Sequence, residues 1–409
     1  MFQSRQLVNS VSRARLEKTV RALAEVPTRH TLSGAKGADV AAAWLERELK
    51  SYGGNLQVVQ QRWVQAAGGR MTKAQELGNV LATLPGTDSP ERVLVVSGHY
   101  DSRVTDVLDA SSPAPGANDD ASGVSVVLEC ARLMAGLKPR CTVVFAAVTG
   151  EEQSLLGSAQ LAKSLKERGK SIIAMATYDI VGNSVSQEGK RDDKHIRVFS
   201  TSDELGELAT QATRRKSLGT DGDSPARTLA RAIADSARRQ VKGISVTLTL
   251  RNDRYGRGGD HSAFLAAGFP ASVRFTEPGE DWRHQHQDLR TEKGVTYGDL
   301  PEFVDYNYLA RVAQVAVAWL SELAQAPSAP VRVTLKQDLS AQTTLQWAGV
   351  DGAASYDVLW RRTTEFDWSG SKSFSATQAV LPLSKDDYLF GVRAVATSGA
   401  RGLPTVVGR

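Results

Sequence analysis

Residues 92–101 read RVLVVSGHYD, an almost continuous apolar run that ends in polar residues. Two runs of the same kind follow, CTVVFAAVTGEE at 141–152 and SIIAMATYDIVG at 171–182. Runs this rich in apolar and β-branched residues are typical of strands that are covered on both faces. A helical pattern at 122–136 separates the first two runs. This alternation predicts an α/β domain in which a mostly parallel central sheet is the middle of three layers.

The same domain continues on both sides of this segment. Amphipathic helices are predicted within 11–53, at 228–240 and at 306–324, and further strands at 56–64, 79–84 and 245–250. The polar and charged segment 184–225 is predicted to be an insertion, made partly of loop and partly of exposed helix. Together these elements form the predicted domain 1–326.

The pattern changes at the sequence PSAP, residues 327–330. After it, helical periodicity is absent and apolar residues alternate with polar ones, as in SYDVLWR at 355–361 and YLFGVRAV at 388–395. Alternation with a period of two is typical of half-buried strands. Residues 327–409 are therefore predicted to form a separate small all-β sandwich.

The composition excludes several classes of protein. The 409 residues are 41% hydrophobic and 23% charged, which excludes a disordered or collagen-like chain. The net charge is +5, but the basic residues are scattered, so we expect no nucleic-acid partner. No run approaches the ~18 apolar residues of a membrane span, and no signal peptide is visible at the start. The two cysteines, Cys130 and Cys141, are expected to be buried free thiols, too few for a thiolate zinc site.

Acidic and imidazole side chains stand where the three central strands are predicted to end. His99 ends the first run, Glu151 and Glu152 end the second, and Asp179 ends the third. The carboxyl ends of parallel strands meet at one edge of a sheet, where ligands bind. The coincidence over three strands therefore favours a functional site over three unrelated polar strand ends.

The turn GANDDASG at 116–123 adds Asp119 and Asp120 to this edge. These carboxylates could instead only begin the following helix, where negative charge is favourable. Five neighbouring carboxylates would, however, repel one another and take up protons unless cations were present. Arg103 is the only basic residue beside these motifs. Carboxylate and imidazole ligands without thiolate suit zinc, cobalt or manganese, so the sequence predicts a metal site.

A further histidine ligand is expected later in the chain. The candidates are His261 in GGDHSAF and the pair His284 and His286 in RHQHQD. His30 and His195 lie in polar surroundings without an acidic motif, so we expect them to be surface residues.

Four motifs resemble, in order and spacing, those of the co-catalytic di-zinc exopeptidase family. They are SGHYDS at 97–102, GANDDASG at 116–123, TGEEQSLLGS at 149–158 and YDIVGN at 178–183. The family includes bacterial leucyl aminopeptidases, glutamate carboxypeptidase and the glutaminyl cyclases. The resemblance spans roughly residues 15–325, and the tail at 327–409 resembles a fibronectin type III domain.

The resemblance implies metal-binding roles for the matching residues. Asp119 would bridge two zinc ions, for which cobalt or manganese could substitute. His99 and Asp179 would complete the shell of one ion, and Glu152 with a late histidine that of the other. Two such ions can share a water molecule and polarise the scissile carbonyl group.

The resemblance also implies roles for residues that do not bind metal. Glu151 would be the general base that takes a proton from the water and passes it to the leaving amine. Asp101 would hold the second ring nitrogen of His99 and fix its tautomer.

The late histidine is the point at which the pattern is least regular. The family usually places this ligand four residues before an aspartate. His284 stands four residues before Asp288, so we favour His284 as the ligand and keep His286 as the alternative.

Three further residues lie near positions that the family uses. GGDHSAF resembles a Ser-Asp-His segment of the family, so Asp260 and His261 would position substrate or support the ligands, unless they only begin a helix. Tyr255 stands near the place where some members carry a tyrosine that stabilises the oxyanion, with the spacing off by one.

The resemblance implies a zinc-dependent exopeptidase, and first an aminopeptidase acting on peptides with a free N-terminus. The alternatives are carboxypeptidase, dipeptidase or glutaminyl-cyclase-like use of the same site, and a receptor-like binding protein without catalysis. The intact ligand set and Glu151 argue against the last. The fibronectin-like domain could bind a polymer or a protein partner. Because such domains are usually extracellular, we predict a periplasmic or secreted protein, with the cytoplasm as the alternative.

Overall fold

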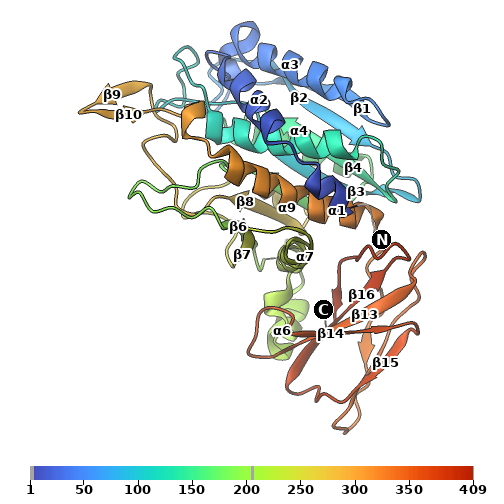
Figure 1. The fold of residues 1–409 in the computed structure, drawn as a ribbon. Coiled ribbons are helices and arrows are strands. Elements are labelled where there is room, and N and C mark those ends of the chain that lie inside the picture. The colour runs from blue at the N-terminus through green and yellow to red at the C-terminus, as the bar shows by residue number, and fades with distance from the viewer. Residues whose placement is uncertain (1–3, 204–206, 409) are drawn as a thin grey trace.

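The computed structural model describes residues 4–203 and 207–408. Its central sheet has eight strands in the order β1-β2-β4-β3-β5-β8-β6-β7 (Figure 1). The strands are β1 (Gln57–Gln65), β2 (Gln75–Leu84), β3 (Ser89–His99), β4 (Cys141–Val148), β5 (Ser171–Tyr178), β6 (His195–Phe199), β7 (Ser245–Thr249) and β8 (Ser272–Thr276). The four central strands β4, β3, β5 and β8 are parallel, while β1, β2 and β6 join antiparallel neighbours. The predicted α/β class with a mostly parallel sheet is confirmed.

Helices cover both faces of this sheet, because its central strands are apolar on both sides. In β3, Leu94 and Val96 pack into one apolar core, whereas Val93 and Val95 pack into another. The first core takes in α1 (Ser4–Asn9), α2 (Arg13–Ala24), α3 (Ala38–Ser51), α4 (Gly123–Met134), α7 (Pro225–Gln240) and α9 (Tyr306–Gln325). The second takes in α5 (Leu156–Glu167) and α8 (Asp260–Ala266). The predicted three layers are therefore confirmed.

The segment 184–225 is not only loop and exposed helix, as expected from its polarity. It contributes β6, which pairs with β7 and β8 inside the central sheet. The rest of it carries α6 (Ala209–Leu218), whose side chains are mostly exposed. The strand is only five residues long, so its alternation was too short to distinguish it from the polar surroundings.

The C-terminal part consists of two small antiparallel sheets. One contains β11 (Thr334–Leu335), β12 (Thr343–Gln346) and β15 (Gln378–Leu381); the other contains β14 (Gly370–Phe374), β13 (Ser355–Arg362), β16 (Tyr388–Val395) and β17 (Thr405–Val406). Residues of both sheets share one apolar core, in which Leu345 and Leu381 meet Val358 and Phe390. The sandwich architecture agrees with the sequence, and the relation to fibronectin type III domains stays a prediction.

Buried charges connect this sandwich to the larger domain. Asp223, directly before α7, pairs with Arg231 of α7 and with Arg361 of β13, the latter at 2.8 Å. All three side chains are almost completely buried. Arg393 of β16 also reaches Asp235 of α7 at 2.9 Å. Figure 1 shows the sandwich beside α6 and α7, so the two parts are joined by specific contacts and by more than their linker.

Two further predictions can be compared with the described residues. Within them, no helix has the length and apolar character that crossing a membrane requires. Cys130 and Cys141 are free and buried, as expected. A hairpin of β9 (Arg290–Glu292) and β10 (Val295–Tyr297), which follows the predicted histidine pair in the chain, projects from the larger domain (Figure 1).

Candidate active site

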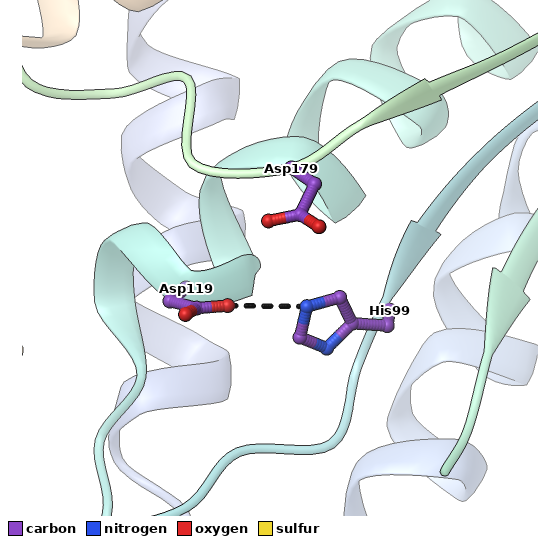
Figure 2. Close-up of side chains that lie close together, drawn as sticks. All are labelled: His99, Asp119 and Asp179. Atoms are coloured by element: carbon purple, nitrogen blue, oxygen red, sulfur yellow. Dashed lines mark ion pairs between the residues drawn. The ribbon is translucent and has the colours of Figure 1, made fainter. Parts of the chain in front are cut away.

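The polar residues at the strand ends lie together at one edge of the sheet. His99 is the last residue of β3, Asp179 directly follows β5, and Glu151 and Glu152 lie in the loop after β4. Because β3 is parallel to both β4 and β5, these ends meet where the chain order reverses around β3. Figure 2 shows His99 and Asp179 converging with Asp119, which comes from the turn before α4.

Asp119 lies between two groups of ligand atoms. In the first group, His99, Asp119 and Asp179 place one ligand atom each within 4.8 Å of the others. In the second, Asp119, Glu152 and His286 do the same. One carboxylate oxygen of Asp119 is 3.1 Å from Nε2 of His99, and the other is 2.8 Å from Nε2 of His286. The shared aspartate gives the arrangement of a two-metal site.

The donor atoms fit zinc on the chemistry of the site itself. Nε2 of His99 and Oε1 of Glu152 are buried, and within the described residues neither makes a hydrogen bond of acceptable geometry. Each atom has an ion-pair neighbour, Asp119 at 3.1 Å from His99 and Nε2 of His286 at 2.8 Å from Glu152, but buried polar atoms without a well-directed hydrogen bond are costly unless another group satisfies them. Imidazole nitrogens and carboxylate oxygens without thiolate are a ligand set that zinc accepts. The residues present therefore fit zinc.

Asp120, next to Asp119, holds the ends of β3 and β5 to the start of α4. Its carboxylate accepts hydrogen bonds from the backbone N–H groups of His99 at 3.0 Å, Gly123 at 3.0 Å and Ile180 at 3.4 Å. A Cβ atom at Gly123 would lie 2.0 Å from the carbonyl oxygen of Tyr178. Glycine thus lets the start of α4 approach the end of β5, which brings Asp119 to Asp179.

Asp101 contacts the glutamate pair as well as the histidine. Its carboxylate accepts hydrogen bonds from the backbone N–H groups of Glu151 at 3.3 Å and Glu152 at 3.1 Å. Nδ1 of His99 lies 3.1 Å from the main-chain carbonyl of Asp101 and 3.6 Å from its carboxylate. Asp101 is therefore placed to orient Glu151 and Glu152 through its carboxylate and His99 mainly through its main-chain carbonyl.

Burial and the charges of neighbouring side chains shift the pKa values of the residues in this cluster. Burial raises the pKa of Glu151 well above its usual range, and the charges of Glu152 and Asp179 raise it further against the opposing effect of His99. Burial would lower the pKa of His286, but Glu152 and Asp119 dominate and raise it to about 9. Without cations the cluster holds protons, and metal binding would release them.

Two arginines reduce the negative charge of the cluster. Arg103 reaches Oε2 of Glu152 at 2.8 Å, as its place in the sequence suggested. Arg274 of β8 reaches Asp179 at 2.9 Å and is completely buried. No motif around Arg274 indicated this contact, because β5 and β8 become neighbours only through the sheet pairing.

We expected His284, and not His286, to lie at the metal site, and the structure places the two residues the other way round. His286 lies in the cluster, with Nε2 2.8 Å from both Glu152 and Asp119. The ring of His284 instead stacks on Phe303, with ring centroids 3.6 Å apart. His286 lies in an irregular loop and has a positive φ of 53°, a local backbone conformation that residue spacing does not reveal.

Three other histidines and one tyrosine were also singled out in the sequence. Tyr255 is 88% exposed and does not line the site, so the structure does not place it for oxyanion stabilisation. His261 is buried, with Nε2 3.0 Å from the carbonyl of Asn252. His195 is a surface residue as expected. His30 is not, because it is fully buried and contacts the carbonyl of Val107 at 3.0 Å.

Asp260, at the first position of α8, is also buried and lies near enough to Glu151 to raise its pKa. The supporting roles expected for Asp260 and His261 stay predictions.

A cavity of about 290 Å³ gives access to the cluster. Its acidic lining residues are Asp119, Glu151, Glu152 and Asp179, and His286 lines it too. A larger groove of about 810 Å³, beside the junction with the C-terminal sandwich, contains none of these residues. The smaller cavity is the candidate active site because the chemically competent side chains open into it.

Comparisons with known proteins agree with this site. A family model described as peptidase family M28 matches residues 79–293. A curated "probable zinc metalloprotease" of Leptosphaeria maculans is 44% identical over 97% of this chain and 94% of its own length. The LapA aminopeptidase of Legionella pneumophila, at 16% identity, covers 79% of this chain and 75% of its own, with a TM-score of 0.58. A glutaminyl cyclase of Fimbriiglobus ruber, at 18% identity, covers 76% and 95%, with a TM-score of 0.52.

Proposed function

The chain belongs to peptidase family M28 as a zinc metalloprotease, and from this premise we propose that it is a two-zinc exopeptidase that removes the amino-terminal residue of peptides. The observation that carries the proposal is the position of Asp119 between two ligand groups. His99 and Asp179 would hold one ion, and Glu152 and His286 the other. When bound, the ions would activate a water molecule and polarise the scissile carbonyl group.

Glu151 is the residue best placed to move the proton. It lines the cavity and, although it also lies close to His99 and Glu152 in a third group of ligand atoms, it belongs to neither of the two groups that share Asp119. Its carboxylate would accept a proton from the attacking water and deliver it to the leaving amine. Asp101 is a positioning residue, because its carboxylate receives the backbone N–H groups of Glu151 and Glu152.

Two observations support amino-terminal specificity. The fold is shared with LapA of Legionella pneumophila, which is an aminopeptidase. The cavity is also rich in carboxylates, which can hold an α-ammonium group. The shared fold with glutaminyl cyclases keeps cyclisation as an alternative, and carboxypeptidase or dipeptidase action as others. The complete ligand set with Glu151 favours an enzyme over a binding protein.

The test uses purified, zinc-loaded protein with a panel of aminoacyl-nitroanilides and free peptides. We expect turnover that chelation abolishes and that zinc or cobalt restores. Acetylating the N-terminus of a peptide should remove most of its turnover, while the same peptide with an amidated C-terminus should still be cleaved. Full activity in metal-free protein would refute the metal mechanism. Equal cleavage of acetylated and free peptides would refute the aminopeptidase assignment alone.

We also propose that the protein works outside the cytoplasm and that residues 327–409 bind a polymer or a protein partner. Both proposals rest on the resemblance of these residues to fibronectin type III domains. Fractionation of the native host with an antibody against the chain tests the location. A pull-down with the isolated sandwich, compared with the whole chain, tests the partner.

A further inference from the structure

Four arginines line the cavity that opens onto the proposed metal ligands. They are Arg70, Arg103, Arg254 and Arg257. Two of them already have carboxylate partners, since Arg103 reaches Glu152 at 2.8 Å and Arg254 reaches Glu280 at 3.0 Å. The other two reach the cavity from separate loops, one before β2 and one before α8.

Arg70 and Arg257 have no carboxylate within ion-pair distance among the described residues. Arg70 donates a hydrogen bond to the main-chain carbonyl of Glu152 at 2.7 Å. Arg257 donates to the amide oxygen of Gln285 at 3.2 Å and lies over the ring of Trp282, 4.9 Å from its centroid. Both guanidinium groups are therefore positioned by neutral partners and keep their charge unpaired.

The charge of the whole cavity also favours an anionic ligand beside these arginines. In the proposed enzyme, two divalent ions would balance the four acidic lining residues Asp119, Glu151, Glu152 and Asp179. Arg70 and Arg257 then add positive charge to the parts of the wall that they form, beside the carboxylates of the proposed metal site. Arg257 is only partly exposed, and partial burial of an unpaired cation is unfavourable unless an anion joins it.

We infer that the cavity selects peptides that carry a carboxylate next to the scissile bond, and that Arg257 with Arg70 binds this carboxylate. Guanidinium groups suit the task because their planar N–H groups can make two parallel hydrogen bonds to a carboxylate. The carboxylate can be the free C-terminus of a dipeptide or the side chain of an acidic residue. The inference rests on the proposed function, since it names the substrate class of that same site.

The experiment compares substrates that share one amino-terminal leucine. Leu-Ala is compared with Leu-Ala-amide to test the α-carboxylate, and Leu-Asp-amide is compared with Leu-Asn-amide to test the side chain. We expect the acidic member of at least one pair to have a kcat/KM about tenfold or more higher, mainly through KM, as suits hydrogen bonds to a charged group. The pair that shows the preference identifies the source of the carboxylate.

Variants then assign the preference to the arginines. Arg257→Ala should abolish most of it by raising KM for the acidic substrate alone, Arg257→Lys should restore part of it, and Arg70→Ala should weaken it. Arg251→Ala is the matched control, because Arg251 lies in the same loop but is exposed, stacks on Tyr255 and does not line the cavity. Equal turnover within both pairs, or a preference that Arg257→Ala leaves unchanged, would overturn the inference.

A binding measurement separates this inference from the proposed function. Succinate and its neutral diamide are titrated calorimetrically into zinc-loaded wild-type and Arg257→Ala protein. Carboxylate binding to zinc is common to both proteins, so only the difference between them reports on Arg257. If no peptide is cleaved but succinate binds about tenfold more weakly to the variant, the exopeptidase proposal fails and the carboxylate site stands. Equal succinate affinity in both proteins would sink the carboxylate site whatever the turnover.

Discussion

Nε2 of His286 lies 2.8 Å from Oε1 of Glu152, although the two residues are far apart in the chain. The same nitrogen is 2.8 Å from Asp119, so His286 approaches the two carboxylates at once. His284, only two residues earlier, turns away and packs against Phe303. Replacing His286 should therefore affect metal binding, whereas replacing His284 should not.

His286→Ala is expected to bind only one zinc ion tightly and to be nearly inactive. His284→Ala should keep two ions and appreciable activity, because the contacts that it loses, with Phe303, the carbonyl of Gly298 and the carboxylate of Asp281, all lie outside the two ligand groups. Metal content after dialysis, measured side by side for both variants, checks the prediction. A two-metal His286→Ala protein beside a one-metal His284→Ala protein would contradict it.

Glu151→Gln should keep both ions and lose activity. The amide can still occupy the place of the carboxylate but cannot accept the proton, and general-base catalysis contributes ~10²–10⁴ in rate. We therefore expect kcat to fall by that order with little change in KM. Glu152→Gln, the matched control next to it, should weaken the binding of one ion instead. If Glu151→Gln lost an ion and Glu152→Gln lost only kcat, Glu152 would be the general base and Glu151 the ligand.

Asp223→Asn should destabilise the whole chain. The substitution leaves the buried guanidinium groups of Arg231 and Arg361 without their carboxylate, and breaking such a pair costs about 3–5 kcal/mol. Urea unfolding followed by tryptophan fluorescence measures the free energy of unfolding. Asp338→Asn is the control, because Asp338 is itself partly exposed and losing its pairs with Lys336 and Lys385 should leave the unfolding curve nearly in place. Identical curves for Asp223→Asn and wild type would show that the buried cluster does not hold the two domains together.

His261 should make stability depend on pH below neutrality. Burial lowers its pKa from 6.5 to about 4, although Asp253 opposes this. Between pH 6.5 and 4 the unfolded chain takes up a proton that the folded one does not, so the free energy of unfolding falls as the pH falls. The loss amounts to about 3 kcal/mol and levels off below pH 4.

The variant His261→Gln removes the titrating ring and should flatten this part of the pH profile. Urea unfolding of chelated protein at several pH values compares it with wild type. His195→Gln, at an exposed position, serves as the control and should follow the wild-type profile. An unchanged slope in His261→Gln would mean that other groups cause the acid sensitivity.

Much of the fold followed from local patterns. The three apolar runs correspond to β3, β4 and β5, and their polar ends meet because parallel strands end at one edge. The alternating tail likewise forms two small antiparallel sheets. These features depend on periodicities within one segment, which a single sequence displays directly.

The rest depended on contacts between distant segments. Spacing along the chain could not show which of His284 and His286 reaches the cluster, because both lie in an irregular loop and the partners of His286, Asp119 and Glu152, are distant in sequence. His30 was expected at the surface because its partners, Gln153 and the carbonyl of Val107, are far away in sequence. The four arginines of the cavity carry no common motif, since they come from three separate loops.

The cluster of buried carboxylates has a consequence for the amount of enzyme that a cell can maintain. Like charges held together without cations weaken the folded state, and an ion that binds only the folded state stabilises it by about 2.7 kcal/mol at one hundred times its dissociation constant. The melting temperature should therefore rise with added zinc. A change of this size alters the fraction of unfolded chains that cellular proteases remove. Zinc supply would then set the abundance of the enzyme as well as its activity, so that a starved cell loses the protein itself.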